Sequence, residues 1–129
     1  MKKIITTTMT LFITALITIS INACDNEETL ALPEEADFFI TSKTLGIKSY
    51  GSPFVTITVR NIGSATGYNV SCDVQAKVGN TIIDAGFAFF ANGGNIISGE
   101  SALDDAIFFK LESHSDYDSL EFELSWLTR

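Results

Sequence analysis

Apolar and polar residues alternate along most of the chain beyond its first third. The alternation is strict over residues 55–60, 69–78 and 120–126. Because successive side chains of a strand point to opposite faces, a period of two predicts strands with one buried and one wet face. No segment carries the 3.6-residue period of an amphipathic helix. Three further segments are less regular but strand-like: residues 38–43, 82–90 and 106–111.

Turn-forming residues separate these predicted strands. Gly79-Asn80 fits a two-residue hairpin loop that needs positive φ, and Gly, Asn, Ser and Pro cluster at 51–53, 61–64, 92–95 and 98–100. Six or seven strands in roughly 90 residues is the size of an immunoglobulin-like sandwich. We therefore predict an all-β domain over residues 37–129, an immunoglobulin-like antiparallel β-sandwich of about seven strands.

The first 23 residues differ in composition from the rest. Met1-Lys2-Lys3 is basic, and residues 4–21 are uncharged and mostly apolar or threonine. That length could cross a bilayer, but a basic start, an uncharged core and a small-residue end fit a secretory signal peptide better. The following Ile21-Asn22-Ala23-Cys24 resembles the lipobox of bacterial lipoprotein precursors. The resemblance implies cleavage before Cys24 and acylation of its thiol.

Acylation at Cys24 would anchor the protein, because each buried methylene contributes about 0.8 kcal/mol and several chains give a stable attachment. Two alternatives stay open: an ordinary signal peptide, or an uncleaved helix followed by an ordinary cysteine. Removal of residues 1–23 takes away two lysines and leaves 6 basic and 16 acidic side chains. Anionic lipid head groups repel such a chain, so the membrane contact is expected to come from the lipid.

Residues 24–36 are predicted to form a lipidated acidic tether, because they are charged, contain Pro33 and lack periodicity. The run Asp25-Asn26-Glu27-Glu28 resembles the surface-export signal of Bacteroidota lipoproteins. Asp25 directly after the cysteine also resembles the inner-membrane retention signal of enteric bacteria. The longer run favours the outer membrane or cell surface within the cell envelope, and a plain solvated spacer is the alternative.

Residues 55–74 carry a second resemblance. A strand, the sequence Asn61-Ile62-Gly63, small residues and another strand follow one another, as in the CARDB and FxLYD families of immunoglobulin-like bacterial domains. Residues 97–101, Ile-Ser-Gly-Glu-Ser, are similar to the turn before a later strand in both families. The Leu-Tyr-Asp signature of FxLYD is not visible. The resemblance covers about residues 37–127 and implies extracytoplasmic scaffolding or adhesion, since its motifs are structural.

Composition excludes several functions. The chain has 129 residues with 8 Lys and Arg against 16 Asp and Glu, a formal net charge of -8. A nucleic-acid binder that neutralises phosphates needs the opposite balance. One His and two Cys supply little for zinc or histidine chemistry. His114 has Ser and Asp close in sequence, but adjacent residues do not converge as a triad requires, and no nucleophile-elbow motif is present. We predict no catalytic residue and no enzyme.

Acidic residues gather toward the C-terminus. Asp104, Asp105, Asp116 and Asp118 fall in expected loops, and carboxylate oxygens suit Ca²⁺. These four are candidate ligands of a low-affinity Ca²⁺ site, with a solvated acidic rim as the alternative, because no EF-hand spacing is present. No other cofactor or metal is expected. The sequence Asp118-Ser119-Leu120 resembles the O-glycosylation acceptor of Bacteroidota periplasmic proteins. The resemblance implies that Ser119 is a candidate glycosylation site.

Three phenylalanine pairs, at 38–39, 89–90 and 108–109, suggest a binding surface. Neighbours on a strand face opposite ways, so one ring of each pair points outward. We predict Phe39, Phe90 and Phe108 to be the outward rings, forming an aromatic patch for a protein partner or a sugar. Coverage of these rings by loops or by inward twisting of edge strands is the alternative.

Cys72 lies on the apolar face of its predicted strand, so we expect a buried thiol that acts as a small hydrophobe. An intermolecular bridge, or a disulfide with Cys24 if that residue is not acylated, are the alternatives. Taken with the anchor and the sandwich, the sequence predicts a membrane-anchored bacterial lipoprotein with a non-catalytic binding or assembly module of the cell envelope. A Ca²⁺-dependent glycan-binding or adhesion module and a purely structural accessory subunit of an envelope complex remain alternatives.

Overall fold

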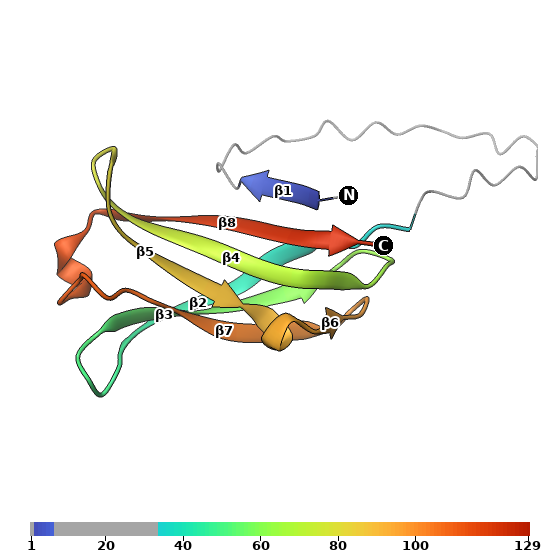
Figure 1. Ribbon diagram of the computed structural model, residues 1–129, viewed down its shortest axis with the longest axis horizontal. Coiled ribbons are helices and arrows are strands. Elements are labelled where there is room, and N and C mark those ends of the chain that lie inside the picture. Colours follow the sequence, from blue (N-terminus) through green and yellow to red (C-terminus); the bar gives the residue numbers. More distant parts are fainter. Residues whose placement is uncertain (1, 7–33) are drawn as a thin grey trace, which may run out of the picture.

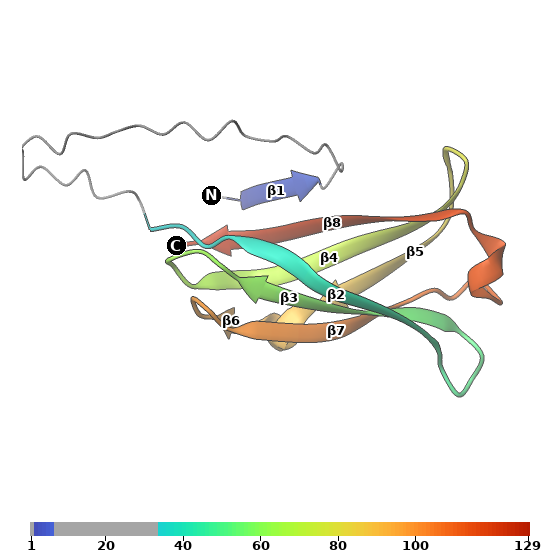
Figure 2. The ribbon, with the colours of Figure 1, turned by 180° about the vertical axis from the view of Figure 1, so that it is seen from behind.

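The computed structural model describes residues 2–6 and 34–129. Two antiparallel sheets face each other in a β-sandwich (Figure 1 and Figure 2), which confirms the predicted all-β fold. Seven strands follow one another from residue 38 onward, interrupted by two short 3-10 turns. The elements are β1 (Lys2–Thr6), β2 (Phe38–Ile47), β3 (Pro53–Asn61), β4 (Gly67–Val78), β5 (Thr81–Phe89), η1 (Phe90–Gly93), β6 (Asn95–Ile96), β7 (Ser101–Ile107), η2 (His114–Asp116) and β8 (Ser119–Thr128).

The strand order explains how the layers meet. One sheet runs β1-β8-β4-β5, with β6 paired to the start of β4, and the other runs β2-β3-β7. β5 and β7 are the last strands of their sheets, and side chains of each accept hydrogen bonds from the other strand or its continuation. This closed side of the sandwich holds the two layers together. The described residues contain no helix long and apolar enough to cross a membrane.

On β3, β4 and β8 the core consists of the apolar residues that the alternation predicted to be buried. Those of β3, β4 and β8 interdigitate between the sheets, as sandwich cores do. The Trp126 ring packs against Phe38 with centroids 5.3 Å apart, and its Nε1 donates to the carbonyl oxygen of Ala36. Ala36, at the end of the predicted tether, is itself buried. The fully or almost fully buried set includes Val55, Ile57, Val59, Val70, Cys72, Val74, Ala76, Leu124 and Trp126.

The predicted strand at residues 106–111 is displaced in the structure. β7 covers Ser101–Ile107, so it begins directly after the Ser98-Gly99-Glu100 turn and ends earlier than expected. The segment after it is held by the buried carboxylate of Asp84, which accepts hydrogen bonds from the backbone N–H groups of Lys110 and Leu111. Phe108 and Leu111 are therefore buried in a loop tied to β5 instead of continuing the strand.

The Asn-x-Gly segment is a structural turn built around one buried amide. Asn61 Nδ2 donates to the carbonyl oxygens of Ala65 and Ile96, and its Oδ1 accepts from the N–H groups of Asp37 and Gly63. One side chain therefore satisfies four backbone groups from separate segments. A Cβ on Gly63 would lie 2.2 Å from the carbonyl oxygen of Glu35, so this position requires glycine.

Candidate functional site

The predicted aromatic patch of Phe39, Phe90 and Phe108 does not form, because two of the three orientations were wrong. Phe90 and Phe108 are fully buried in the core, while Phe39 is 44% exposed but lies on β2, in the other sheet from β5. Phe39 lines a separate hollow of about 420 Å³ with Arg60 and Ile62. The outward members of the other two pairs are Phe89 and Phe109.

The reversal on β5 has a clear cause in the closed side of the sandwich. The inward positions of β5 carry Asp84, Gly86 and Ala88, which are small or polar. A Cβ on Gly86 would already lie 3.1 Å from the Cβ of Ala106, so β5 and β7 approach too closely for large inward side chains. The large apolar residues of β5 therefore face outward, against the usual rule, and a glycine within a strand is the sequence signal for such an approach.

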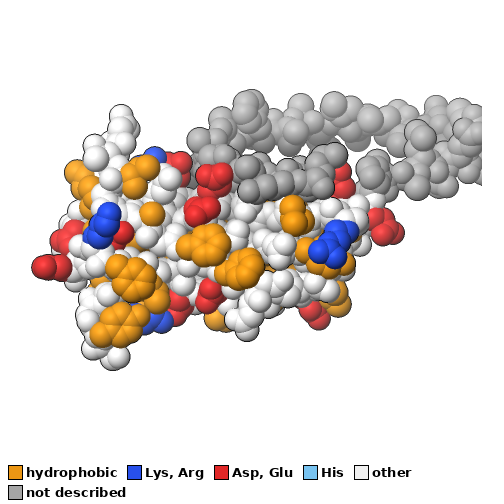
Figure 3. Space-filling view, in the orientation of Figure 1, with side chains coloured by type: hydrophobic (Ala, Val, Ile, Leu, Met, Phe, Trp, Pro, Cys, Tyr) orange, Lys and Arg blue, Asp and Glu red, His pale blue; other side chains and the backbone are white. Residues whose placement is uncertain are grey.

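Phe87 and Phe89 form an exposed aromatic pair on the outer face of β5. Their ring centroids lie 6.1 Å apart with an interplanar angle of 27°, and they are 53% and 38% exposed. Figure 3 shows hydrophobic side chains gathered over β5 with acidic side chains beside them. We call this pair the aromatic platform. Two rings held side by side on a rigid strand offer a preformed apolar contact surface.

Polar groups border the aromatic platform along two cross-strand rows. In one row Phe89 lies opposite Ser71, which lies opposite Ser125, and the two hydroxyl oxygens are 2.9 Å apart. In the other row Phe87 lies opposite Asp73, which lies opposite Glu123. A ligand on the platform would therefore meet hydroxyl groups next to Phe89 and carboxylates next to Phe87.

A hollow of about 270 Å³ adjoins the platform at Phe89. Asn69 in its lining has a positive φ of 50°, and the extra residue of the β4 bulge lies beside it between Tyr68 and Ser71. The bulge displaces β4 from strict pairing and so opens the surface next to the ring. The lining residues are Asn69, Ser71, Phe89, Ser125, Trp126 and Leu127.

The four candidate Ca²⁺ ligands are not brought together. Asp104 accepts from the N–H of Phe89 at 2.8 Å, Asp116 accepts from the N–H groups of Glu112 and Ser113, and Asp118 accepts from the N–H of Gly79. Over residues 34–129 no three His, Cys, Asp or Glu side chains gather as a metal site. These carboxylates support turns and strand ends, and the Asp104 bond also fixes the backbone beneath the aromatic platform.

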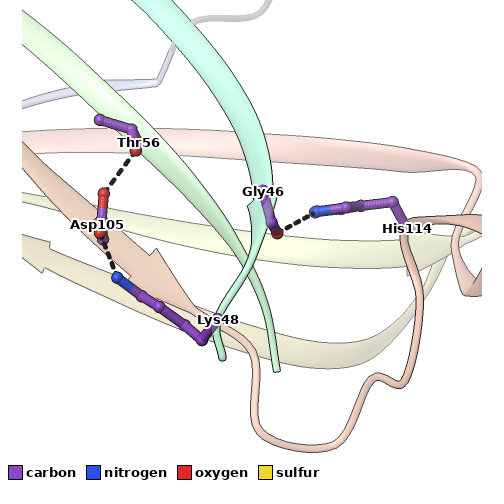
Figure 4. Close-up of polar contacts among 5 residues, drawn as sticks. All are labelled: Gly46, Lys48, Thr56, Asp105 and His114. Carbon is purple, nitrogen blue, oxygen red and sulfur yellow. Dashed lines mark hydrogen bonds and ion pairs between the residues drawn. The ribbon is translucent and has the colours of Figure 1, made fainter. Parts of the chain in front are cut away.

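Asp105 belongs to a polar chain on the outer face of β2, β3 and β7 (Figure 4). Its carboxylate accepts from Lys48 Nζ at 2.5 Å and from Thr56 Oγ1 at 2.6 Å. Desolvation of Asp105 works against ionisation, but these two hydrogen bonds outweigh it and lower the pKa of its carboxyl below the ordinary value. The hydrogen bond to Asp105 raises the pKa of Lys48. The pair therefore stays ionised and joins the β2–β3 loop to β7.

His114 fixes the η2 loop to β2 and has no catalytic geometry. Its Nε2 donates to the carbonyl oxygen of Gly46 at 2.8 Å (Figure 4), which leaves Nδ1 to accept from the Tyr117 hydroxyl at 2.7 Å. The hydroxyl groups of Ser113 and Ser115 hydrogen-bond to each other, and Ser113 caps the turn. Both ring nitrogens are thus engaged in holding the loop, and neither contacts a serine hydroxyl.

Cys24 lies outside the described residues, and Ser119 is exposed at the start of β8, where a modifying enzyme could reach it. Cys72 is buried, as expected, and is a free cysteine. Burial raises the pKa of the Cys72 thiol to about 12. Because the thiolate is the reactive form, this cysteine is chemically inert in the folded domain.

Because its thiol is buried, Cys72 lowers the stability of the domain at alkaline pH. The unfolded thiol ionises near its ordinary pKa of 9.0, whereas the folded one stays protonated up to about 12. The protonated thiol therefore makes its whole contribution to the free energy of unfolding below pH 9, and this contribution falls as the pH rises from 9 toward 12. We expect the stability difference between a Cys24→Ala chain and its Cys24→Ala/Cys72→Ala derivative to shrink by about 1.4 kcal/mol from about pH 8 to about pH 10. Urea unfolding at both values measures it, and a constant difference would contradict the assignment.

The sequence matches no family model and no curated protein. Among solved structures, the chain is similar to the crystal structure of DesR, a β-glucosidase from Streptomyces venezuelae in complex with D-glucose, at 17% identity and a TM-score of 0.41. The likeness covers 72% of this chain and 12% of that chain. So distant a likeness to a small part of an enzyme carries no argument about function. The chain is an all-β sandwich protein, and its resemblances to lipoprotein precursors, CARDB and FxLYD stay predictions.

Proposed function

We propose that the chain is a membrane-anchored bacterial lipoprotein whose sandwich is a non-catalytic binding or assembly module of the cell envelope. The aromatic platform carries the proposal of binding, because Phe87 and Phe89 are two exposed rings that stack side by side on one strand. Contiguous exposed apolar surface on a folded protein often marks an interaction site. The anchor rests on the lipobox-like Ile21-Asn22-Ala23-Cys24, and an outer-membrane or cell-surface location rests on the acidic run that follows.

The position of the platform supports assembly with a protein partner. Aromatic side chains dominate the energetic centres of protein interfaces, where polar groups form the rim. Here two rings lie beside serine hydroxyls and the carboxylates of Asp73 and Glu123, an arrangement of that kind. The Asp104 hydrogen bond to the Phe89 N–H keeps the strand backbone rigid beneath the rings, so little conformational entropy is lost on binding.

The platform is tested with tagged full-length protein isolated from gently solubilised membranes of its native host. We expect a co-purifying protein at stoichiometric yield. In a Phe87→Ala/Phe89→Ala variant the yield of this partner should fall by at least about tenfold. Phe109→Ala is the matched control, because Phe109 is 75% exposed but lies beyond β7, off the platform. Equal retention of the partner by both variants, with unchanged unfolding midpoints, would remove the platform from the proposal.

The anchor is tested separately by Cys24→Ala. We expect this variant to leave the membrane fraction, because loss of the acyl chains removes the contribution of every buried methylene. Mass spectrometry of the wild-type N-terminus is expected to show an acylated Cys24. A wild-type chain that retains residues 1–23 would contradict the lipoprotein assignment without affecting the platform.

A glycan-binding module is the second candidate, favoured by the hollow beside Phe89. Its Asn69 amide and the hydroxyl groups of Ser71 and Ser125 can hydrogen-bond sugar hydroxyls while the ring contacts the apolar sugar face. Envelope polysaccharide that raises the unfolding temperature of the wild type, but not of Phe89→Ala, would favour this candidate. Repeating the measurement with and without Ca²⁺ separates a calcium-dependent module from a calcium-independent one.

A further inference from the structure

The outer edge of β8 has the features of a strand-binding site. β8 is ten residues long and pairs with β4 along one side. Within the described residues, only β1 lies on its other side (Figure 1), antiparallel, with Lys2 opposite Leu127 and Thr6 opposite Glu123. The structure thus shows this edge occupied by an added extended segment that comes from a distant part of the chain.

The other edges of the sandwich are protected in ways that β8 is not. β5 and β7 cover each other through the Asp84 and Asp104 hydrogen bonds. β2 carries an extra residue between Ile40 and Ser42, and a bulge of this kind hinders addition of another strand. β8 has no proline, lysine or arginine, and the bulge in its pairing with β4 lies in β4. Such a long, regular edge requires a cover.

We propose that the β8 edge binds an extended segment of a partner protein, which adds to the sheet as an antiparallel strand in the place of β1. The inference rests on the proposed function, because cleavage before Cys24 removes Lys2–Thr6 and with it the strand that pairs with Glu123–Leu127 on this edge. Backbone hydrogen bonds to β8 then supply the affinity, and the alternating side chains of the added strand supply the specificity.

Charge indicates the chemistry of this segment. Glu121, Glu123 and Ser125 alternate on the outer face of β8. Glu121 pairs with Lys77, whereas Asp73 and Glu123 lie opposite each other and form no ion pair within the described part of the chain. Like charges directly opposite are unfavourable, so a lysine or arginine beside Glu123 would stabilise the complex. A second copy pairing through its own β8 would bring more glutamates together, which argues against self-association.

The test uses the full-length chain in its native host, with the photo-crosslinking residue p-benzoylphenylalanine at Leu127. Leu127 lies on the outer face of the edge, opposite Lys2 in the register with β1. We expect the crosslinked peptide to be a segment of another protein with alternating apolar residues and a basic residue. Glu123→Lys is expected to lower the yield about fivefold or more. The matched control Glu112→Lys makes the same charge change in the exposed loop before η2 and should leave the yield unchanged.

The other outcomes are distinguishable because the N-terminus of the same sample is determined by mass spectrometry. A crosslink to residues 2–6 on an uncleaved chain would overturn both the partner-segment inference and the lipoprotein assignment. A chain that begins at an acylated Cys24 and yields no crosslink would overturn the inference and leave the proposed function standing. A crosslink to β8 of a second copy, or one that Glu123→Lys leaves unchanged, would overturn the stated partner chemistry.

Discussion

Replacing Phe90 by alanine is expected to destabilise the domain by about 3–5 kcal/mol, whereas the same change at the adjacent Phe89 costs far less. Phe90 is fully buried, so its truncation leaves a cavity between the sheets. Phe89 is 38% exposed on the aromatic platform, where its ring stacks beside Phe87 and lies against Gly93. The two variants remove the same atoms from neighbouring residues, one at the end of β5 and one at the start of η1, and differ in whether the ring points outward or into the core.

Urea unfolding followed by the fluorescence of the single tryptophan, the buried Trp126, measures both variants. Phe89→Ala should keep the native emission and lose the co-purifying partner. Phe90→Ala should unfold at much lower urea. Comparable losses of stability in the two variants would show that the face assignment of β5 is wrong, and with it the aromatic platform.

Asn61→Ala is expected to be the most damaging polar substitution, destabilising the domain by about 3 kcal/mol or more, since each buried group left unsatisfied costs about 1–3 kcal/mol. The change leaves the N–H groups of Asp37 and Gly63 and the carbonyl oxygens of Ala65 and Ile96 without their side-chain partner. Asn61→Asp should not rescue stability, because a carboxylate would face those two carbonyl oxygens. Thermal and urea unfolding measure both variants.

Asn80→Ala is the control for this prediction, because Asn80 is exposed in the turn between β4 and β5. Its effect should stay within about 0.5 kcal/mol, as expected of a surface substitution. A stability loss for Asn61→Ala no larger than that of Asn80→Ala would mean that the four hydrogen bonds are replaced by water. The amide would then not hold the turn together.

The fold could be predicted from the sequence because the alternation on β3, β4 and β8 reports burial directly. On these strands, large apolar residues occupy one face and polar residues the other, so period and orientation agree. The Asn61-Ile62-Gly63 turn was also recognisable as a structural motif. Its physical reason, a buried amide bound to four backbone groups, needs the three-dimensional structure, since Ile96 and Asp37 are distant in sequence.

The candidate site was predictable in kind but not in its residues. The phenylalanine pairs suggested an exposed aromatic surface, yet the choice of ring depends on how closely β5 approaches β7. That distance is set by Gly86 and Ala106, which belong to different sheets; a glycine within a strand signals a close approach, but it does not identify the strand that comes close. Likewise, proximity in sequence suggested that the aspartates could share an ion, but each is engaged by its own backbone or side-chain donors.

The way the chain enters the domain determines how a mechanical load is distributed. The carbonyl oxygen of Glu35 accepts from the N–H groups of Ser64 and Ala65, and that of Ala36 accepts from Trp126 Nε1. A pull applied through residue 34 is therefore transmitted at once to the β3–β4 loop and to β8, before it reaches the ladder of β2. The sandwich would resist as a unit rather than losing β2 one hydrogen bond at a time, which suits the proposed attachment of the domain through a single anchor on its N-terminal side.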